Sequence, residues 1–319
     1  MIHNISEQTQ DAPLRLVRKG ALPQDLDYQN TDCISFLKSL PSRSVSLIAI
    51  DPPYYRVVKD KWDSQWNSYE EYFDWCSEWL TEMERVMKYS CSVWIFGYSY
   101  QLSKILPNME TNANLNFRQQ ITIDKGMRSV AGRISSQLKM FPTTTEYAYF
   151  LHYEARDVLQ KLLNNERTRL GMTGKDCNAL VGKATSGGAF WSTVAGPNKP
   201  REFRVYPTRQ DWEALQTKMI LPSYDDYVFR FNLPQGVTDV WGDINFYDKS
   251  EKKFHSTQKP IPLMERIINC SSKEGDIVLD FFGGSATTAV ACKRLNRTFW
   301  GCEIDPVYYS KGLNRIRES

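Results

Sequence analysis

Short, continuously apolar runs alternate with amphipathic stretches along much of the 319-residue chain. The clearest apolar run, Val45 to Ile50, is rich in β-branched residues and is followed directly by Asp51, Pro52 and Pro53. An apolar run that ends at two prolines predicts a buried parallel strand whose carboxyl end opens into a rigid turn. Because open α/β sheets bind ligands outside the carboxyl ends of their strands, this turn is a candidate ligand site.

Further elements with the same rhythm follow up to about residue 152. Residues 69–87 carry apolar side chains at three- and four-residue steps, which predicts an amphipathic helix. Apolar runs at 92–96, 119–124 and 146–152 predict strands. The fold class expected from this alternation is α/β, with a doubly wound, mixed but mostly parallel sheet. The polar and aromatic connection at 55–68 lies at the mouth of the candidate site and could close over a substrate.

The regular rhythm breaks down between Tyr153 and Asp243, where glycines and prolines separate short pieces of chain. Lysines, arginines and aromatic residues are interleaved with them. We interpret this stretch as an irregular recognition region inserted into the sheet domain. The alternative is a disordered insertion, which the many aromatic residues disfavour.

The α/β pattern returns after this region. A helix is expected at 262–270 and a strand at 276–280, followed by a turn with Gly283 and Gly284, a helix, and a strand at 298–303 that ends on Glu303. Glu303 lies 20 residues after Gly283, the arrangement in which glycines let the backbone approach a nucleoside and a carboxylate binds ribose hydroxyls. The turn has neither the G-x-G-x-x-G pattern nor a P-loop, so a nucleoside without a pyrophosphate is favoured.

Composition narrows the class of protein. With 41% hydrophobic and 24% charged residues, the chain can bury a full core and exceeds one average domain. No run approaches the roughly 18 apolar residues that cross a bilayer, and the first residues lack the features of a secretory signal, so we expect a cytoplasmic protein without membrane segments. Seven scattered cysteines and three histidines predict neither a disulfide framework nor a metal site.

Charge is distributed unevenly. The net charge is only +3, but residues 118–220 contain 16 Lys and Arg against 9 Asp and Glu. Such a surplus is the footprint expected where a protein contacts phosphates. The alternative is a solvent-exposed surface that has an excess of basic residues and no phosphate partner.

Together these motifs resemble those of amino-group DNA methyltransferases, and in particular the permuted β group, in which Asp-Pro-Pro-Tyr comes first, the target-recognition region second and the cofactor motif last. The likeness covers roughly residues 28–150 and 254–316. It implies transfer of a methyl group from S-adenosylmethionine to adenine N6 or cytosine N4 of a flipped-out base in double-stranded DNA. It also implies four regions: an N-terminal arm (1–22), a catalytic half (23–152), a target-recognition region (153–250) and a cofactor-binding half (251–319).

The resemblance carries over residue by residue. Asp51, Pro52, Pro53 and Tyr54 match the catalytic motif, and an aspartate in first place favours adenine, since serine there is similar to the cytosine enzymes. Asp32 matches the residue that meets the cofactor's adenine, and Glu303 the ribose-binding acid. The full set expected to bind the cofactor is Asp32, Cys33, Asp51, Thr257, Gln258, Lys259, Asp280, Phe281, Phe282, Gly283, Gly284, Ser285, Thr287, Glu303 and Ile304.

Two positions depart from the family pattern. Phe281 stands where the family usually has proline, which we expect to alter only the stiffness of the loop. Ala286 stands where it usually has glycine and adds a methyl group where the backbone would approach the ligand or adopt positive φ. We expect this second departure to affect cofactor affinity rather than activity.

The chemistry of the reaction explains the residue types. An exocyclic base amine is a poor nucleophile because its lone pair is delocalised into the ring. The Asp51 carboxylate and the Pro52 carbonyl can each accept one amine hydrogen, which favours a pyramidal nitrogen aimed at the methyl group. Tyr54 would stack on the target base, which cannot be reached inside a duplex.

Other functions stay open at this point. Methyltransferases that act on RNA or on a protein glutamine have similar Pro-Pro-Tyr turns, usually with asparagine first, and a DNA-binding relative without catalysis is a further alternative. The permuted order and the large basic insert argue against the first of these. The resemblance further implies a homodimer and a cognate restriction endonuclease as possible partners.

Overall fold

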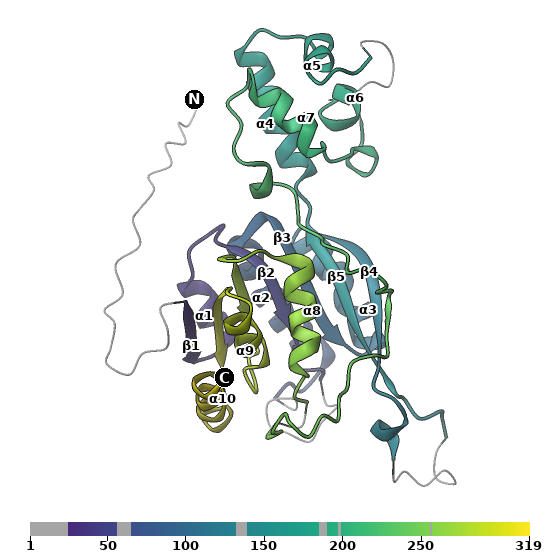
Figure 1. Ribbon diagram of the computed structural model, residues 1–319, viewed down its shortest axis with the longest axis vertical. Coiled ribbons are helices and arrows are strands. Elements are labelled where there is room, and N and C mark those ends of the chain that lie inside the picture. The colour runs from purple at the N-terminus through teal and green to yellow at the C-terminus, as the bar shows by residue number, and fades with distance from the viewer. Residues whose placement is uncertain (1–24, 56–64, 132–138, 185–189, 197–198, 256) are drawn as a thin grey trace.

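The computed structural model describes residues 25–55, 65–131, 139–184, 190–196, 199–255 and 257–319. The arm expected at 1–22 and most of the connection at 55–68 lie outside the described residues. An eight-stranded sheet organises the body, in the order β1-β8-β7-β2-β3-β5-β4-β6 (Figure 1). Only β5 runs antiparallel to its neighbours, so the predicted mixed, mostly parallel sheet is confirmed.

The strand bounds agree closely with the hydrophobic pattern. All six residues of β2 are buried, as expected for a strand that is covered on both faces. The strands are β1 (Leu26–Asn30), β2 (Val45–Ile50), β3 (Met87–Gly97), β4 (Leu115–Asp124), β5 (Thr145–Tyr153), β6 (Val240–Trp241), β7 (Ile277–Asp280) and β8 (Thr298–Glu303).

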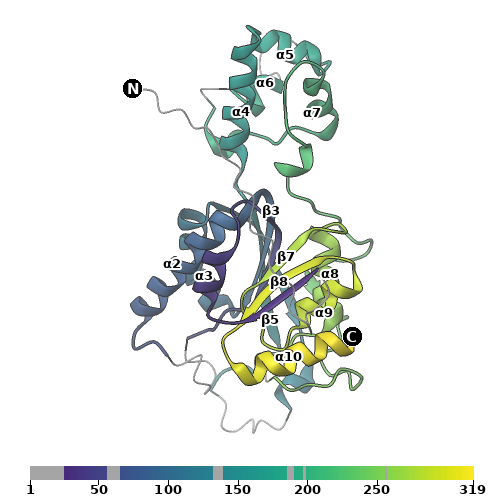
Figure 2. The same ribbon diagram turned by 90° about the vertical axis from the view of Figure 1, so that its left-hand side faces the viewer.

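Helices cover both faces of the sheet (Figures 1 and 2). One face carries α1 (Cys33–Ser39), α2 (Tyr69–Val86) and α3 (Ser99–Asn112), and the other carries α8 (Ile261–Ser271), α9 (Thr287–Arg294) and α10 (Pro306–Glu318). Two hydrophobic clusters fill the space between the sheet and these layers. Within the described residues, no helix is long and apolar enough to cross a membrane.

The described residues in the first part of the region expected to be irregular include four α-helices that the sequence analysis did not predict, whereas residues 217–239 have neither an α-helix nor a strand. These helices are α4 (Arg156–Arg169), α5 (Gly174–Leu180), α6 (Phe190–Val194) and α7 (Arg209–Gln216), which form a separate lobe in Figure 1. Two capping boxes start α5 and α7, with Thr173 paired to Asp176 and Thr208 paired to Asp211. The Thr-x-x-Asp spacing of both boxes is visible in the sequence and could have revealed these helices.

The direction of β5 decides where this helical lobe lies. His152 near the end of β5 pairs with Ser92 of β3, which pairs in turn with Leu47 in the first half of β2, so α4 begins at the amino edge of the parallel strands. At roughly 3.4 Å per residue, the nine residues of β5 extend about 30 Å. The helical lobe (residues 156–216) and the carboxyl ends of the parallel strands therefore lie at opposite edges of the sheet, as Figures 1 and 2 show.

Candidate active site

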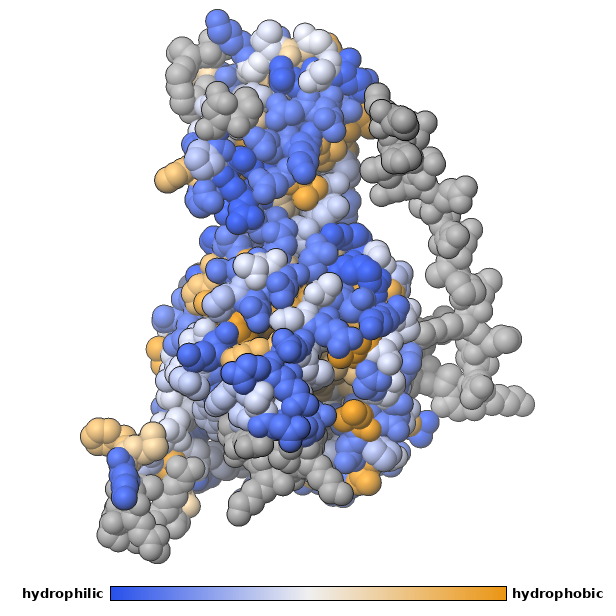
Figure 3. Space-filling view, turned by 180° about the vertical axis from the view of Figure 1, so that it is seen from behind, coloured by the Kyte–Doolittle hydropathy of each residue, from blue (hydrophilic) through white to orange (hydrophobic). Residues whose placement is uncertain are grey.

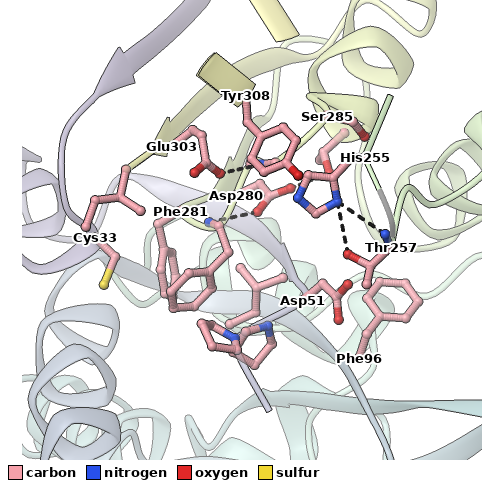
Figure 4. A pocket seen from close by; sticks show the side chains of 18 of the residues that line it. Cys33, Asp51, Phe96, His255, Thr257, Asp280, Phe281, Ser285, Glu303 and Tyr308 are labelled. Atoms are coloured by element: carbon pink, nitrogen blue, oxygen red, sulfur yellow. Dashed lines mark hydrogen bonds between the residues drawn. The ribbon is translucent and has the colours of Figure 1, made fainter. Parts of the chain in front are cut away.

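One cavity of about 220 Å³ lies at the carboxyl edge of the sheet (Figure 4). The turn after β2 and the turn after β7 both contribute to its wall, although they are far apart in the sequence. The two strands are direct neighbours, with Leu47 paired to Val278, which brings the turns together. The predicted site residues all line this cavity: Asp32, Cys33, Asp51, Pro52, Pro53, Tyr54, Thr257, Gln258, Lys259, Asp280, Phe281, Phe282, Gly283, Gly284, Ser285, Thr287, Glu303 and Ile304.

The turn after β2 is fixed by aromatic side chains. Tyr72 of α2 donates a hydrogen bond to the Pro53 carbonyl, at 2.8 Å. Tyr55 adopts a left-handed backbone conformation (φ 60°), and its ring packs on Tyr72 with the ring centroids 5.7 Å apart. The Tyr54 hydroxyl donates to Asp51 Oδ1. Asp51 and the two prolines are therefore presented to the cavity on a rigid support.

A buried charge cluster surrounds Asp51. The Lys259 ammonium lies 2.7 Å from Asp51 Oδ2 and also donates to Glu146 Oε1 of β5. Burial raises the pKa of Asp51 to about 6, with Lys259 opposing the shift and Glu146 adding to it. Burial by itself would lower the pKa of Lys259, but Asp51 and Glu146 hold it above its usual value, so the ammonium stays charged.

The glycine turn after β7 is close-packed. A Cβ on Gly283 would lie 2.6 Å from Tyr28 Cε2 and 3.0 Å from the Cys302 carbonyl oxygen, so only glycine fits. Asp280 accepts hydrogen bonds from the Phe282 N–H at 3.1 Å and from the Thr288 hydroxyl at 2.6 Å. Burial nevertheless raises the pKa of Asp280 to about 7.

The two departures from the family pattern meet the expectations only in part. Ala286 does take the left-handed conformation (φ 58°, ψ 31°), but it is fully buried in the core beside α10 and does not line the cavity. Phe281 does more than alter the stiffness of the loop, because its buried ring packs on Trp79 with centroids 5.7 Å apart. The methyl group of Ala286 therefore does not obstruct the cavity.

Glu303 ends β8 with its carboxylate held by the backbone. Oε2 accepts from the Gly284 N–H at 2.8 Å, and Oε1 accepts from the Asp305 N–H at 2.7 Å. Figure 4 shows this carboxylate on the cavity wall. Burial raises the pKa of Glu303, while these two N–H groups stabilise its ionised form. A fixed carboxylate with lone pairs to spare can accept hydrogen bonds from a pair of hydroxyl groups.

Beside this acid, α1 begins at the cavity, because β1 pairs with β8 and Asn30 lies next to Glu303. Asp32 is the N-cap of α1 and accepts from the Ser35 N–H at 2.8 Å. Cys33 is buried beside it, and burial raises the pKa of its thiol far above the usual value, so this cysteine is an apolar wall rather than a nucleophile.

Sequence reasoning missed several cavity residues. His255 packs edge-on against Tyr308, with ring centroids 4.2 Å apart, and its Nδ1 lies 3.1 Å from the Thr257 hydroxyl. Phe96 could have been found, because it lies at the carboxyl end of a predicted strand. The remaining residues have no sequence signal beyond adjacency to a motif, and the missed set includes Trp75, Phe96, His255, Met264, Thr288 and Tyr308.

Comparison with known families agrees with this geometry. A model of the N6/N4 methyltransferase family, described as DNA methylase, matches residues 45–313. The chain belongs to this DNA methylase family. The match spans the turn after β2, the helical lobe and the turn after β7, so it includes both halves of the cavity wall.

Two relatives of this DNA methylase are type II methyltransferases. It is 30% identical to M.BamHI of Bacillus amyloliquefaciens over 86% of this chain and 53% of the relative. It is 27% identical to M.HinfI of Haemophilus influenzae over 92% of this chain and 69% of the relative. The chain thus spans about half the length of the first relative and about two thirds of the second.

Solved structures share the fold. The M1.HpyAVI–SAM complex superposes with a TM-score of 0.54 at 18% identity, covering 91% of this chain and 98% of that one. The PvuII DNA methyltransferase, titled as cytosine-N4-specific, superposes with a TM-score of 0.54 at 14% identity, covering 92% of each chain. At these identities the comparison confirms the sheet architecture and goes no further.

Proposed function

We propose that this DNA methylase transfers a methyl group from S-adenosylmethionine to the N6 amine of adenine in double-stranded DNA. The observation that carries the proposal is the single cavity in which the Asp51 turn meets the glycine turn and Glu303. A methyl transfer needs the acceptor amine and the donor within bonding distance in one site, and the neighbouring strands β2 and β7 supply it.

The cavity residues suit a nucleoside-bearing cofactor. Glu303 would accept the ribose hydroxyls, since its carboxylate is already oriented by two backbone N–H groups. Asp32, Cys33 and Ile304 would surround the adenine, and Gly283 and Gly284 bring the backbone close to the ligand. When bound, S-adenosylmethionine supplies an electrophilic methyl group on a positively charged sulfur.

Asp51 and Pro52 are the groups we assign to the amine. The Asp51 carboxylate and the Pro52 carbonyl would accept its two hydrogens and hold the nitrogen in a reactive geometry. Tyr54 lines the same cavity, and its ring would stack on the extruded base once its hydroxyl leaves Asp51. The methylated amine then loses its proton to Asp51 or to water.

Double-stranded DNA would approach at the carboxyl edge of the sheet. The described parts of the connection between β4 and β5, residues 125–131 and 139–144, project from the body there and carry Arg128 and Lys139, together with the exposed Phe141 (Figure 3). Residues 124–128 and 242–247 line a second cavity of about 320 Å³ at this edge.

The target-recognition role expected for residues 153–250 remains a prediction, and we refine it here. The basic helical lobe lies at the amino edge, about 30 Å from the cavity, so its arginines and lysines are too distant to contact the base being methylated. We assign base-proximal DNA contacts to the β4–β5 connection and to residues 242–253. A homodimer stays a prediction, and so does a cognate endonuclease, which the type II names of the relatives make reasonable.

The deciding experiment uses unmodified double-stranded DNA and methyl-tritiated S-adenosylmethionine, followed by hydrolysis and nucleoside analysis. We expect the label in N6-methyl-2′-deoxyadenosine. Label in N4-methylcytosine would change the target base and retain the enzyme class. The absence of label from the DNA nucleosides would overturn the proposal.

A further inference from the structure

The charge cluster around Asp51 includes Glu146, a residue outside the motifs that resemble the family. Lys259 was expected to bind the cofactor, but its ammonium faces Asp51 Oδ2 at 2.7 Å and Glu146 Oε1. The side chains of Lys259 and Glu146 are each only 9% exposed. Glu146 comes from the antiparallel strand β5, which was predicted as a strand, but Glu146 itself belongs to none of the motifs.

The three side chains come from separate elements that meet only in the folded protein. Asp51 follows β2, Glu146 lies in β5, and Lys259 precedes α8. The Thr287 hydroxyl donates to the Lys259 carbonyl at 3.0 Å and so fixes the backbone from which the ammonium extends. The Phe96 ring lies 5.0 Å from the ammonium and closes another side. The lysine is therefore held in one place by charge, backbone and aromatic contacts.

We infer that Lys259, anchored by Glu146, is a positioning residue that orients the Asp51 carboxylate and keeps it ionised for the acceptor amine. The inference rests on the proposed methyl transfer and deepens it. Because Lys259 binds Oδ2, the carboxylate cannot rotate freely, and Oδ1 is the oxygen left to face the amine once the Tyr54 hydroxyl moves away. A protonated Asp51 would present a hydroxyl where the amine needs an acceptor.

Glu146 has a separate role in this arrangement. A lysine side chain has four rotatable bonds, so one ion pair does not fix it. The carboxylate on a rigid strand provides the second contact. Glu146 Oε2 in turn lies 3.6 Å from the Lys125 ammonium, so the two acids, Asp51 and Glu146, face two cations. The ionisable groups around Asp51 are Tyr54, Lys125, Glu146, Lys259 and Asp280.

The experiment compares Lys259→Met and Glu146→Gln with the full-length protein. Turnover at saturating S-adenosylmethionine and DNA is measured from pH 5 to 9, and the dissociation constant for S-adenosylmethionine is measured separately. We expect Lys259→Met to lower kcat about 100-fold, the size seen when a preorganised electrostatic group is removed, and to move the acid limb to higher pH. Glu146→Gln should move the acid limb to lower pH, because a negative charge near Asp51 is lost.

Opposite shifts distinguish positioning from mere support of the fold, which would change both variants in the same direction or shift neither limb. Lys161→Met, an exposed lysine on α4, is the matched control and should behave as wild type. If Lys259→Met does not fold, Glu146→Gln decides by itself: an unshifted acid limb overturns the inference. Cofactor affinity reduced more than tenfold with kcat unchanged would also overturn it, since Lys259 would then be a cofactor ligand.

A readout without turnover separates this inference from the proposed function. Infrared titration of ¹³C-aspartate-labelled protein, with Asp51→Asn used to assign the band, follows ionisation of Asp51 directly. A wild-type protein that transfers no methyl group would refute the proposed function, whereas the infrared titration would still show whether Lys259 and Glu146 set the state of Asp51. Identical titrations in all variants would refute the inference.

Discussion

Replacement of Glu303 by glutamine tests the cofactor half of the site. The carboxylate accepts the Gly284 N–H with one oxygen and the Asp305 N–H with the other, at 2.8 and 2.7 Å. An amide of the same shape can keep only one of these bonds, because its NH₂ group would face a backbone donor. The variant also loses the negative charge that we expect to bind the ribose hydroxyls.

The size of the effect follows from the bonds that change. A hydrogen bond to a charged group contributes about 1.5–3 kcal/mol, and each 1.4 kcal/mol is a tenfold change in affinity. We therefore expect Glu303→Gln to weaken binding of S-adenosylmethionine about 10- to 150-fold. At saturating cofactor kcat should stay close to wild type, since Glu303 lies away from the amine.

Titration calorimetry gives the dissociation constant, and turnover at several cofactor concentrations gives the separation of KM from kcat. Glu274→Gln is the matched control, because Glu274 is exposed in the turn before β7. Melting curves of both variants report any general loss of stability. An affinity within threefold of wild type in a folded Glu303→Gln protein would refute the assignment, as would a loss of kcat with unchanged affinity.

Four further changes test other parts of the site. Asp51→Ala should lower kcat by about 10²–10³-fold or more while cofactor affinity, measured by calorimetry, stays nearly unchanged, because the acceptor of the amine hydrogen is lost. Burial raises the pKa of Asp280 to about 7, so its carboxyl group binds more protons in the folded state than in the unfolded state. The free energy of unfolding therefore declines as the pH rises from about 4 to 7. Asp280→Asn removes this dependence, so its melting temperature relative to wild type should be higher at pH 8 than at pH 5. Arg128→Ala combined with Lys139→Ala should weaken DNA binding and reduce the slope of log affinity against log salt by up to about 2, whereas Lys161→Ala with Lys175→Ala in the helical lobe should change neither. Ala286→Gly relieves the strain of a left-handed alanine, which stabilises the folded protein by about 1–2 kcal/mol. It also removes a buried methyl group and makes the unfolded chain more flexible, which together destabilise the protein by about 1–2 kcal/mol. The free energy of unfolding should therefore change by less than about 1 kcal/mol, and calorimetry should show an unaltered cofactor affinity.

The sheet was predictable because its strands are buried on both faces. β2 and β8 match the predicted residue ranges, and a strand of this kind has a continuous apolar run that ends abruptly in a turn. The position of the cavity followed from the same argument, since parallel strands place their carboxyl ends at one edge. The residues of the Asp51 turn and the glycine turn were therefore predictable as a group.

The partners of the charged residues were not predictable in the same way. Lys259 lies in a motif that suggested cofactor binding, and its contact with Glu146 depends on the pairing of β3 with β5. A glutamate inside an apolar strand has no pattern that identifies what it faces. The helical lobe was missed for a different reason: three of its helices, α5, α6 and α7, are only five to eight residues long, and the glycines between them suggested irregular chain.

The antiparallel direction of β5 separates two places where this sheet can accept extra chain. A segment inserted before β5, between β4 and β5, emerges at the carboxyl edge and lies beside the cavity. A segment inserted directly after β5 emerges at the amino edge, where the helical lobe is found. The chain then returns past α8, where the Asn232 N–H binds the Cys270 carbonyl at 2.7 Å, and re-enters the sheet as β6. If DNA approaches at the carboxyl edge, as proposed, we expect bases next to the target to be recognised by the first insertion and by the segment after β6, and we expect changes in the second insertion to leave the reaction undisturbed.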